Sequence, residues 1–340
     1  MVNGFPGPRR NEAVARVLRR INGMRIIAGD LGGTKTLLQL VEVLPGGRKT
    51  VAEQRYESGG FATFEALVAD FVGRAGSLPV DAACFAVAGP VFGDSAEITN
   101  LGWSISAPAL AAAFAIPHVA LINDFHAVAL GVPLLAPADL VSLNQGKRVP
   151  HAPIAILGAG TGLGEANLVW DGTRWNVIPG EGGHADAGPQ DEEQAQLFLQ
   201  ILREYGHVSW ERLLSGRGLV NIHNFLTGVG RPYAETIPGE IAELADAGDP
   251  AASRAFAIFV DLYGAEAGNM ALRTLARGGV FLAGGVAAKN LRHFTTGAFL
   301  DAFLRKGRFT SVMREMPIDV IVNQNVGLLG ATDRAISMAK

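Results

Sequence analysis

The chain has 340 residues, which is too long for one ordinary hydrophobic core and indicates about two domains. Hydrophobic residues make up 49% of it, which excludes global disorder, and its 43 glycines follow no three-residue period, which excludes a collagen-like chain. The net charge is -3, and residues 26–340 hold 23 basic and 31 acidic side chains, so we expect no nucleic acid as the main partner.

Residues 1–23 form a basic extension, in which a short amphipathic helix is expected over 11–21. The segment lacks the apolar core of a secretory signal, and a plain extension is favoured over an organelle-targeting peptide. The least charged stretch, residues 98–138, is broken by glycines and prolines, so no membrane-spanning segment is expected.

The first half is predicted to open with a β-hairpin. An apolar strand begins at Met24, turns at Gly32 and Gly33, and returns as a second strand that ends before Pro45. The hydrophobic pattern then predicts a helix within 61–73, a buried strand at 82–87, a helix at 108–114 and a strand at 119–122.

The second half repeats this theme. A strand from Ala155 runs into the glycine-rich turn 158–164, and another strand follows at 165–170. Later elements are helices at about 191–203 and 252–276 and a strand at 280–282. Two such halves predict an α/β fold with its ligand site in the cleft between them.

The single cysteine, Cys84, lies in an apolar run. We expect it to be an inert core residue rather than a nucleophile. Because one cysteine cannot form an intramolecular disulfide, a reducing compartment is favoured, and we expect a cytoplasmic location.

The first glycine turn, Asp30-Leu-Gly-Gly-Thr-Lys35, has the features of a phosphate-binding loop. Gly32 and Gly33 allow the backbone to approach a phosphate closely. Thr34 adds a hydroxyl and Lys35 a positive charge. Asp30 is placed to hold Mg²⁺ through water, because Mg²⁺ keeps much of its hydration. A tight hairpin with a polar tip is the simpler alternative.

Two further glycine segments, 158–164 and 278–285, follow in the second half. Alternating glycines weaken a strand, which is reasonable where a ligand lies against the backbone. Close packing between strand and helix is the alternative for the later segment. Three such loops in this order are more specific than any one of them.

Asp124 follows Asn123 at the end of a predicted strand and is the only Asp, Glu, Lys or Arg between Glu97 and Asp139. A carboxylate in such apolar surroundings is expected to have a raised pKa, which suits a general base. An aspartate before an alanine-rich segment is also a good helix N-cap, and position alone does not separate the two roles.

Glu181 and His184 lie three residues apart in the turn Pro179-Gly-Glu-Gly-Gly-His184, where both can reach one small polar ligand. Zinc is disfavoured, because there is one cysteine and no H-E-x-x-H motif. Glu211 follows in a predicted helix, and taken alone it is better explained as a solvated surface carboxylate.

Six motifs together closely resemble those of bacterial glucokinases of the Glk type. They are Asp30-Leu-Gly-Gly-Thr-Lys, Asn123-Asp-Phe, Gly158-Ala-Gly-Thr-Gly-Leu-Gly, Pro179-Gly-Glu-Gly-Gly-His, His207-Val-Ser-x-Glu-Arg-Leu-Leu-Ser-Gly and Ala283-Gly-Gly-Val. The resemblance runs from about Met24 to the C-terminus. It implies the actin-like/hexokinase fold, with two ribonuclease-H-like α/β domains around a central cleft. It also implies phosphorylation of glucose at O6 with ATP and Mg²⁺, and a homodimer.

The resemblance also implies roles for single residues. Asp124 is the expected catalytic base. The expected ligands of the glucose hydroxyls are Asn123, Glu181, His184 and Glu211, with Asn100 as a further neighbour of the sugar. The expected contacts of ATP are Asp30, Gly32, Gly33, Thr34, Lys35, Gly158, Gly160 and Thr161 at the phosphates, and Gly284 and Gly285 at the adenosine. Asp30 is the expected Mg²⁺ residue, acting through water.

By the same resemblance, a small α/β domain is expected to comprise 24–134 and 320–340, and a large one 135–319. The chain lacks the cysteine cluster that builds a structural zinc site in the ROK-type sugar kinases. The extension 1–23 is absent from short family members, so its role is open.

Other functions remain alternatives from the sequence. Within the enzyme class, the runner-up is a kinase of another hexose such as mannose, and ADP or polyphosphate remains open as the phosphoryl donor. Outside it, a catalytically silent sugar sensor would have lost the base or the phosphate loops, and an actin-like filament protein would not need Glu181, His184 and Glu211 together.

Overall fold

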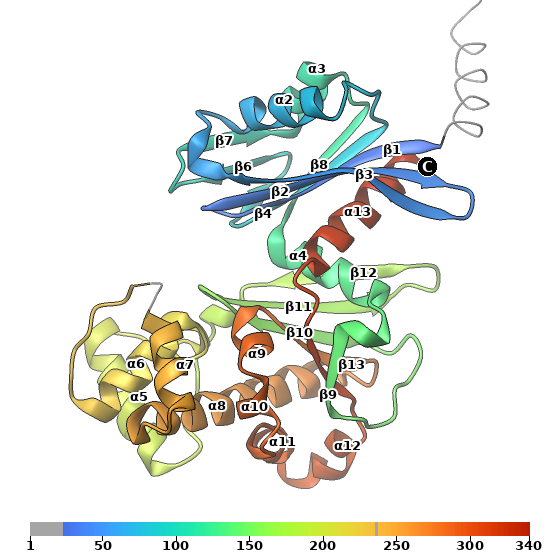
Figure 1. Cartoon of the computed structure of the whole chain (residues 1–340). Coiled ribbons are helices and arrows are strands. Elements are labelled where there is room, and N and C mark those ends of the chain that lie inside the picture. The colour runs from blue at the N-terminus through green and yellow to red at the C-terminus, as the bar shows by residue number, and fades with distance from the viewer. Residues whose placement is uncertain (1–22, 235–236) are drawn as a thin grey trace, which may run out of the picture. The chain divides into compact units, whose positions relative to one another are not determined.

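The structure is a computed structural model that describes residues 23–234 and 237–340 (Figure 1). The chain forms two compact units. The first runs to Leu134 and resumes at Asn325–Lys340, and the second is Leu135–Gln324. The helix expected over 11–21 lies outside the described residues.

The first unit is built on a five-stranded sheet of order β3-β2-β1-β4-β8. The first three neighbours pair antiparallel, and β4 and β8 continue parallel to β1. The strands are β1 (Met24–Leu31), β2 (Lys35–Leu44), β3 (Gly47–Glu57), β4 (Ala82–Val87) and β8 (His118–Asn123). A small antiparallel sheet is formed by β5 (Val91–Phe92), β6 (Ser95–Ile98) and β7 (Trp103–Ser106).

The strand β4 shows why this sheet forms where it does. All six of its residues are buried, as expected for a central strand that helices cover on both faces. Phe85 packs in the cluster shared with α2 (Phe64–Arg74) and α3 (Ala107–Phe114), whereas Cys84 packs in the cluster shared with α13 (Val326–Ala339). Figure 1 shows α2 and α3 on one face and α13 on the other. The expectation that Cys84 is a buried core residue is confirmed.

The second unit has a six-stranded sheet of order β12-β11-β10-β13-β14-β9. Its strands are β9 (Leu140–Asn144), β10 (Ile154–Ala159), β11 (Leu163–Trp170), β12 (Trp175–Gly180), β13 (Gly279–Ala283) and β14 (Ile318–Ile321). Here too an antiparallel meander is followed by parallel strands on the side of its first strand. The predicted α/β fold with two similar halves is therefore confirmed.

The helix α8 (Pro250–Thr274) is central to the second unit. Its buried residues lie on all sides of the helix, and they pack between the sheet and the other helices (Figure 1). Those helices are α5 (Glu192–Tyr205), α6 (Gly216–Thr227), α7 (Ile237–Asp246), α9 (Gly285–Lys289), α10 (Leu291–Phe294), α11 (Ala298–Leu304) and α12 (Thr310–Arg314). In the first unit, α4 (Asp124–Gly131) follows β8.

Several elements were not predicted, and β3 shows the reason. Its sequence is mostly charged or polar, and Tyr56 is its one fully buried residue, so no alternation of apolar residues marks it. It is the edge strand of its sheet, where one face and one edge meet solvent and charged side chains are favoured.

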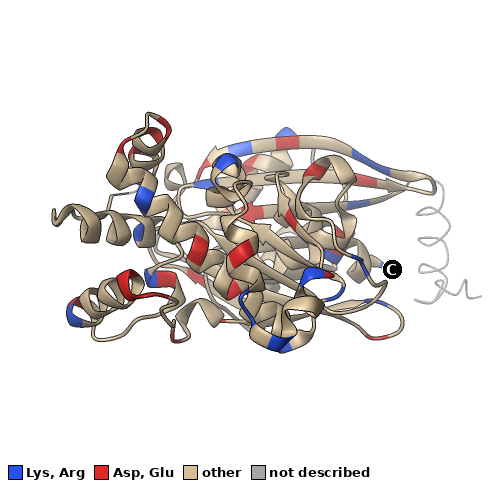
Figure 2. Cartoon of the chain, turned by 90° about the horizontal axis from the view of Figure 1, so that it is seen from below, with Lys and Arg blue, Asp and Glu red and all other residues tan. Residues whose placement is uncertain are grey.

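Residues of both charge signs occur throughout the described chain. Basic and acidic residues are interspersed along the elements and are not gathered by sign (Figure 2). Among residues 23–234 and 237–340, no helix combines the length and the apolar character that crossing a bilayer requires.

The close contact between α8 and α11 yields a stability prediction. A Cβ on Gly264 would overlap the Phe299 carbonyl and lie 2.8 Å from the Ala302 Cβ. We expect Gly264→Ala to lower the free energy of unfolding by about 1–3 kcal/mol, because the two helices must move apart. Urea denaturation measures the change.

The matched control is Gly239→Ala in α7 of the same unit, where a Cβ meets no atom within 4 Å. That substitution is expected to raise the free energy of unfolding by about 0.5–1 kcal/mol, because alanine favours a helix. Equal effects of the two substitutions would contradict the close helix contact.

Candidate active site

The first glycine turn connects β1 to β2 in the first unit. Gly32 N donates a hydrogen bond to the Lys35 carbonyl at 2.9 Å and closes the turn. Asn100 reaches the same turn, because its Nδ2 donates to the Gly33 carbonyl at 3.1 Å. A Cβ on Gly33 would overlap the Asn100 amide, so this contact requires glycine. The structure therefore brings Asn100 to the predicted phosphate loop.

The polar tip of the turn is open to solvent. Thr34 and Lys35 are exposed. The Thr34 carbonyl accepts a hydrogen bond from Ser58 N at 2.8 Å, and Lys35 Nζ lies 3.8 Å from Glu57 Oε1. The loop backbone is thus held from β2 and from the end of β3, while its hydroxyl and ammonium groups stay accessible.

Asn123, and not Asp124, is the N-cap of α4. Asn123 Oδ1 accepts from Phe125 N at 2.9 Å and from His126 N at 3.1 Å. Its Nδ2 donates to the Gly89 carbonyl at 3.1 Å. The helix-cap alternative for Asp124 is therefore wrong, because its neighbour already fills that role.

Asp124 is the first residue of α4, and its Oδ1 accepts from Phe125 N at 2.8 Å. Burial raises the pKa of Asp124 to about 6, the Phe125 amide opposes that rise, and the nearby charge of Asp30 adds to it. The predicted raised pKa is confirmed. The geometry gives a fixed carboxylate that is ionised at neutral pH but is basic enough to accept a proton.

Asp30 is a second half-buried carboxyl group in this unit. Burial raises its pKa, and Arg55 opposes the rise. No group of three or more His, Cys, Asp or Glu side chains among the described residues is arranged as a metal site. A single aspartate still fits Mg²⁺, which binds through one or two carboxylates and keeps waters and substrate phosphates as its other ligands.

The second glycine turn connects β10 to β11 in the second unit. Gly160 N donates to the Gly162 carbonyl at 2.8 Å, and Gly216 N, at the start of α6, donates to the Gly160 carbonyl at 2.8 Å. Glu211 Oε2 accepts from Leu163 N at 3.0 Å. Glu211 is half-buried against this turn, so its interpretation as a solvated surface carboxylate is wrong.

The turn that carries Glu181 and His184 lies beside the second glycine turn. His184 N donates to the Glu181 carbonyl at 3.0 Å, and both side chains are exposed. A Cβ on Gly183 would overlap the Leu163 carbonyl. Leu163 N is bound by Glu211, so Leu163 contacts both Glu211 and the turn that carries Glu181 and His184.

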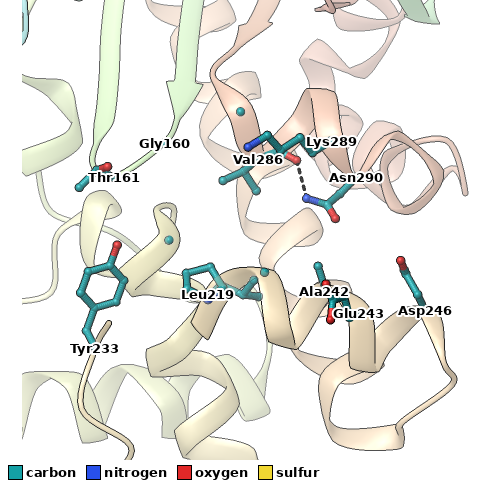
Figure 3. A pocket seen from close by; sticks show the side chains of 14 residues that line it. Gly160, Thr161, Leu219, Tyr233, Ala242, Glu243, Asp246, Val286, Lys289 and Asn290 are labelled. Atoms are coloured by element: carbon teal, nitrogen blue, oxygen red, sulfur yellow. Dashed lines mark hydrogen bonds between the residues drawn. The ribbon is translucent and has the colours of Figure 1, made fainter. Parts of the chain in front are cut away.

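A cavity of about 600 Å³ lies next to the second glycine turn, within the second unit (Figure 3). Of the predicted nucleotide contacts, Gly160, Thr161 and Gly285 line it, whereas Gly158 and Gly284 do not. Gly158 lies within the buried strand β10. Gly284 has a φ of +80°, and a Cβ there would overlap the Ala159 carbonyl, so this position requires glycine.

Most of the cavity wall was not predicted. Figure 3 shows Val286 and Lys289 of α9 on one side and Ala242 and Glu243 of α7 facing them, with Tyr233 near Thr161. The one signal available in the sequence was the position of Lys289, one helical turn after the Gly284-Gly285 pair. The helices α6 and α7 were not predicted, so their contributions could not be found.

The sequence is similar to known proteins over most of its length. The glucokinase family model matches residues 27–338. The chain is similar to a glucokinase of Nostoc sp., with 41% identity over 335 residues that cover 90% of this chain and 97% of the relative.

Solved structures with a similar fold are also found. A glucokinase from an Antarctic psychrotroph is 26% identical, with a TM-score of 0.84 and coverage of 92% of this chain and 99% of that one. A ROK family glucokinase from Streptomyces griseus, solved with glucose and AMPPNP, shares the fold at 22% identity, a TM-score of 0.60 and coverage of 92% and 99%.

The raised pKa of Asp124 yields a prediction on stability. Its pKa in the folded protein exceeds the ordinary aspartate value, so wild-type stability falls as pH rises from about 4 through 6 and Asp124 ionises. Asp124→Asn cannot ionise. We expect it to gain about 1–3 kcal/mol in free energy of unfolding over wild type between pH 4 and pH 8.

Urea denaturation at both pH values measures this gain. Asp94→Asn, in an exposed hairpin turn, is the control and is expected to shift stability equally at both. The absence of any pH-dependent difference for Asp124→Asn would show that Asp124 is not held in apolar surroundings.

Proposed function

The chain belongs to the glucokinase family, and we propose that it transfers the γ-phosphoryl group of ATP to O6 of D-glucose with Asp124 as the general base. The observation that carries this assignment is the half-buried carboxylate of Asp124, fixed by the Phe125 amide. A silent sugar sensor is not favoured, because this base and both glycine turns are present.

The proposed base acts on the 6-hydroxyl of glucose. Asp124 accepts the hydroxyl proton as the oxygen attacks the γ-phosphorus, and ADP leaves with the electrons of the broken P–O bond. The Asn123 cap and the Phe125 amide hold the carboxylate at the start of α4. A fixed base reduces the loss of entropy on reaching the transition state.

The other sugar contacts are proposed from both units. In the second unit, Glu181, His184 and Glu211 would present charged and ring-nitrogen hydrogen-bonding groups to sugar hydroxyls, because Leu163 contacts both Glu211 and the turn that carries the other two. In the first unit, the Asn123 amide retains one N–H for the sugar. A site that pairs each hydroxyl would disfavour epimers such as mannose, because an altered hydroxyl leaves polar groups unpaired.

The cavity of the second unit is proposed to hold the adenosine of ATP. Its volume of about 600 Å³ lies within the usual range for small-molecule sites. Gly160 and Thr161 at its edge would offer backbone N–H groups and a hydroxyl to the phosphates, and Gly285 would let the nucleotide approach the backbone closely. An adenosine-sized cavity favours ATP over polyphosphate as the donor.

The turn Gly32–Lys35 is proposed to contact the phosphates from the first unit, with Asn100 holding its backbone in place. Asp30 would hold Mg²⁺ through water. Bound there with ATP, the ion would neutralise phosphate charge during transfer. It would also relieve the repulsion between Asp30 and Asp124.

We also propose a cytoplasmic homodimer. Supporting the location, the single cysteine is buried and its thiol pKa is raised to about 12, as is typical of an inert thiol in a reducing compartment. Supporting the dimer is the resemblance to the family. Light scattering coupled to size-exclusion chromatography would give the mass.

Substitution of the base is the direct test. Asp124→Asn keeps the shape and the hydrogen bond to Phe125 N but cannot accept a proton. We expect kcat to fall by about 10²–10⁴-fold, with the Kd for glucose within a few-fold of wild type. A coupled ADP assay and calorimetry measure these two values, and near-normal kcat would refute the role of Asp124.

The wild-type pH profile gives an independent check. Asp124 must be ionised to act, so kcat at saturating glucose is expected to rise with pH and to level off above about 6. A panel of ATP, ADP and polyphosphate with glucose and mannose then identifies both substrates. Faster turnover of mannose, or of another donor, would overturn the proposed specificity.

A further inference from the structure

Two acidic residues in the interior of the second unit have no role in the proposed reaction. Glu165 lies on β11, immediately after the second glycine turn, and is 5% exposed. Glu266 lies on α8 and is fully buried. Buried carboxyl groups are costly unless they are paired or neutral, so their presence requires an explanation.

The two carboxyl groups differ in their hydrogen-bond partners. Glu266 Oε1 accepts from Arg273 Nη1 at 3.0 Å, and its Oε2 accepts from Asn269 Nδ2 at 2.8 Å. Glu165 Oε1 is buried and has no hydrogen-bond partner within residues 23–234 and 237–340. The nearby ammonium of Lys306 is bound to the Ala265 carbonyl at 2.9 Å and to Asn269 Oδ1 at 2.7 Å.

These surroundings favour a neutral Glu165. Burial raises its pKa to about 7, the charge of Glu266 adds to the rise, and Arg273 opposes it. The hydroxyl of Tyr263, also on α8, is fully buried nearby, and this burial raises its pKa, so the hydroxyl stays neutral. On the side of the turn, the titratable neighbours are Glu181 and His184.

The carboxyl group of Glu165 packs against the turn 179–184, which carries Glu181 and His184. Glu165 pairs with Gly180 across β11 and β12, directly before that turn. A Cβ on Gly182 would overlap Glu165 Oε2, with the Glu165 Cδ at 2.8 Å. Gly182 lies between Glu181 and His184, so the carboxyl group occupies the space beneath the two exposed sugar ligands.

We propose that Glu165 is a positioning residue for the sugar, which in its neutral form fills the space beside Gly182 and holds the turn that presents Glu181 and His184. This role rests on the proposed function. When Glu165 ionises, a charge without a hydrogen-bonded cation appears beneath the turn. The turn then shifts toward water, and glucose binds more weakly.

This role of Glu165 predicts that the affinity for glucose depends on pH and that Glu165→Gln removes this dependence. In wild type, the Kd for glucose is expected to rise by about three- to tenfold from pH 6 to pH 8.5, since binding favours the protonated form. Glu165→Gln keeps the shape and stays neutral. Its Kd at pH 8.5 is expected to lie below that of wild type, while the values at pH 6 and the kcat values agree within about twofold.

The ratio of the Kd values of wild type and Glu165→Gln at each pH isolates the effect of Glu165, because ionisation of other groups affects both proteins alike. Glu192→Gln, an exposed glutamate at the start of α5, removes the same charge and is expected to follow wild type at every pH. Calorimetry with glucose across the pH range measures each value.

A second pair of variants tests the contact itself. Gly182→Ala is expected to weaken glucose binding by at least tenfold, because its Cβ displaces the Glu165 carboxyl group. The double variant Gly182→Ala/Glu165→Ala has room for that Cβ and is expected to recover most of the lost affinity. The comparison of glucose Kd between the single and the double variant remains informative even if Glu165→Gln does not fold.

The outcomes separate the two proposals. A wild-type protein that does not phosphorylate glucose refutes the proposed function. An active wild type whose Glu165→Gln variant shows the same pH dependence, or a double variant no better than Gly182→Ala, refutes the role of Glu165 and leaves the proposed function intact.

Discussion

The sites in this protein depend on close approach at glycines. Gly33 lies against the Asn100 amide, Gly183 against the Leu163 carbonyl and Gly182 against the Glu165 carboxyl group, and in each case a Cβ would overlap the neighbour. Each contact joins a loop that carries proposed ligands to a strand or loop of the same unit. The position of each loop is therefore set by close packing of its glycine backbone against one neighbouring group.

Loss of water around a carboxyl group raises its pKa at two places in this protein, Asp124 and Glu165, with different consequences. Asp124 lies at the start of a helix, where a backbone N–H stabilises its ionised form against the cost of burial. Glu165 lies on a strand, with no such donor bonded to its buried oxygen among the described residues. Loss of water raises both pKa values, yet the first group stays ionised near neutral pH and the second is poised to change.

The sequence predicted the fold well where burial was uniform. Strand β4 was predicted with its observed bounds because all of its residues are buried, and β10 and β13 were found for the same reason. The edge strand β3 was missed because its charged side chains carry no periodic signal. The cavity wall was missed because Tyr233, Glu243 and Lys289 come from separate segments, and only tertiary packing brings them together.

The helix α13 is the last element of the chain, yet it completes the first unit. Its Leu328, Ala331 and Ala335 cover one face of the sheet that starts at Met24. During translation, that face is covered only after the ribosome has synthesised the entire second unit and then α13. The apolar residues Ile26, Ala28 and Ala82 therefore remain uncovered for most of translation, so the unit that is begun first is finished last.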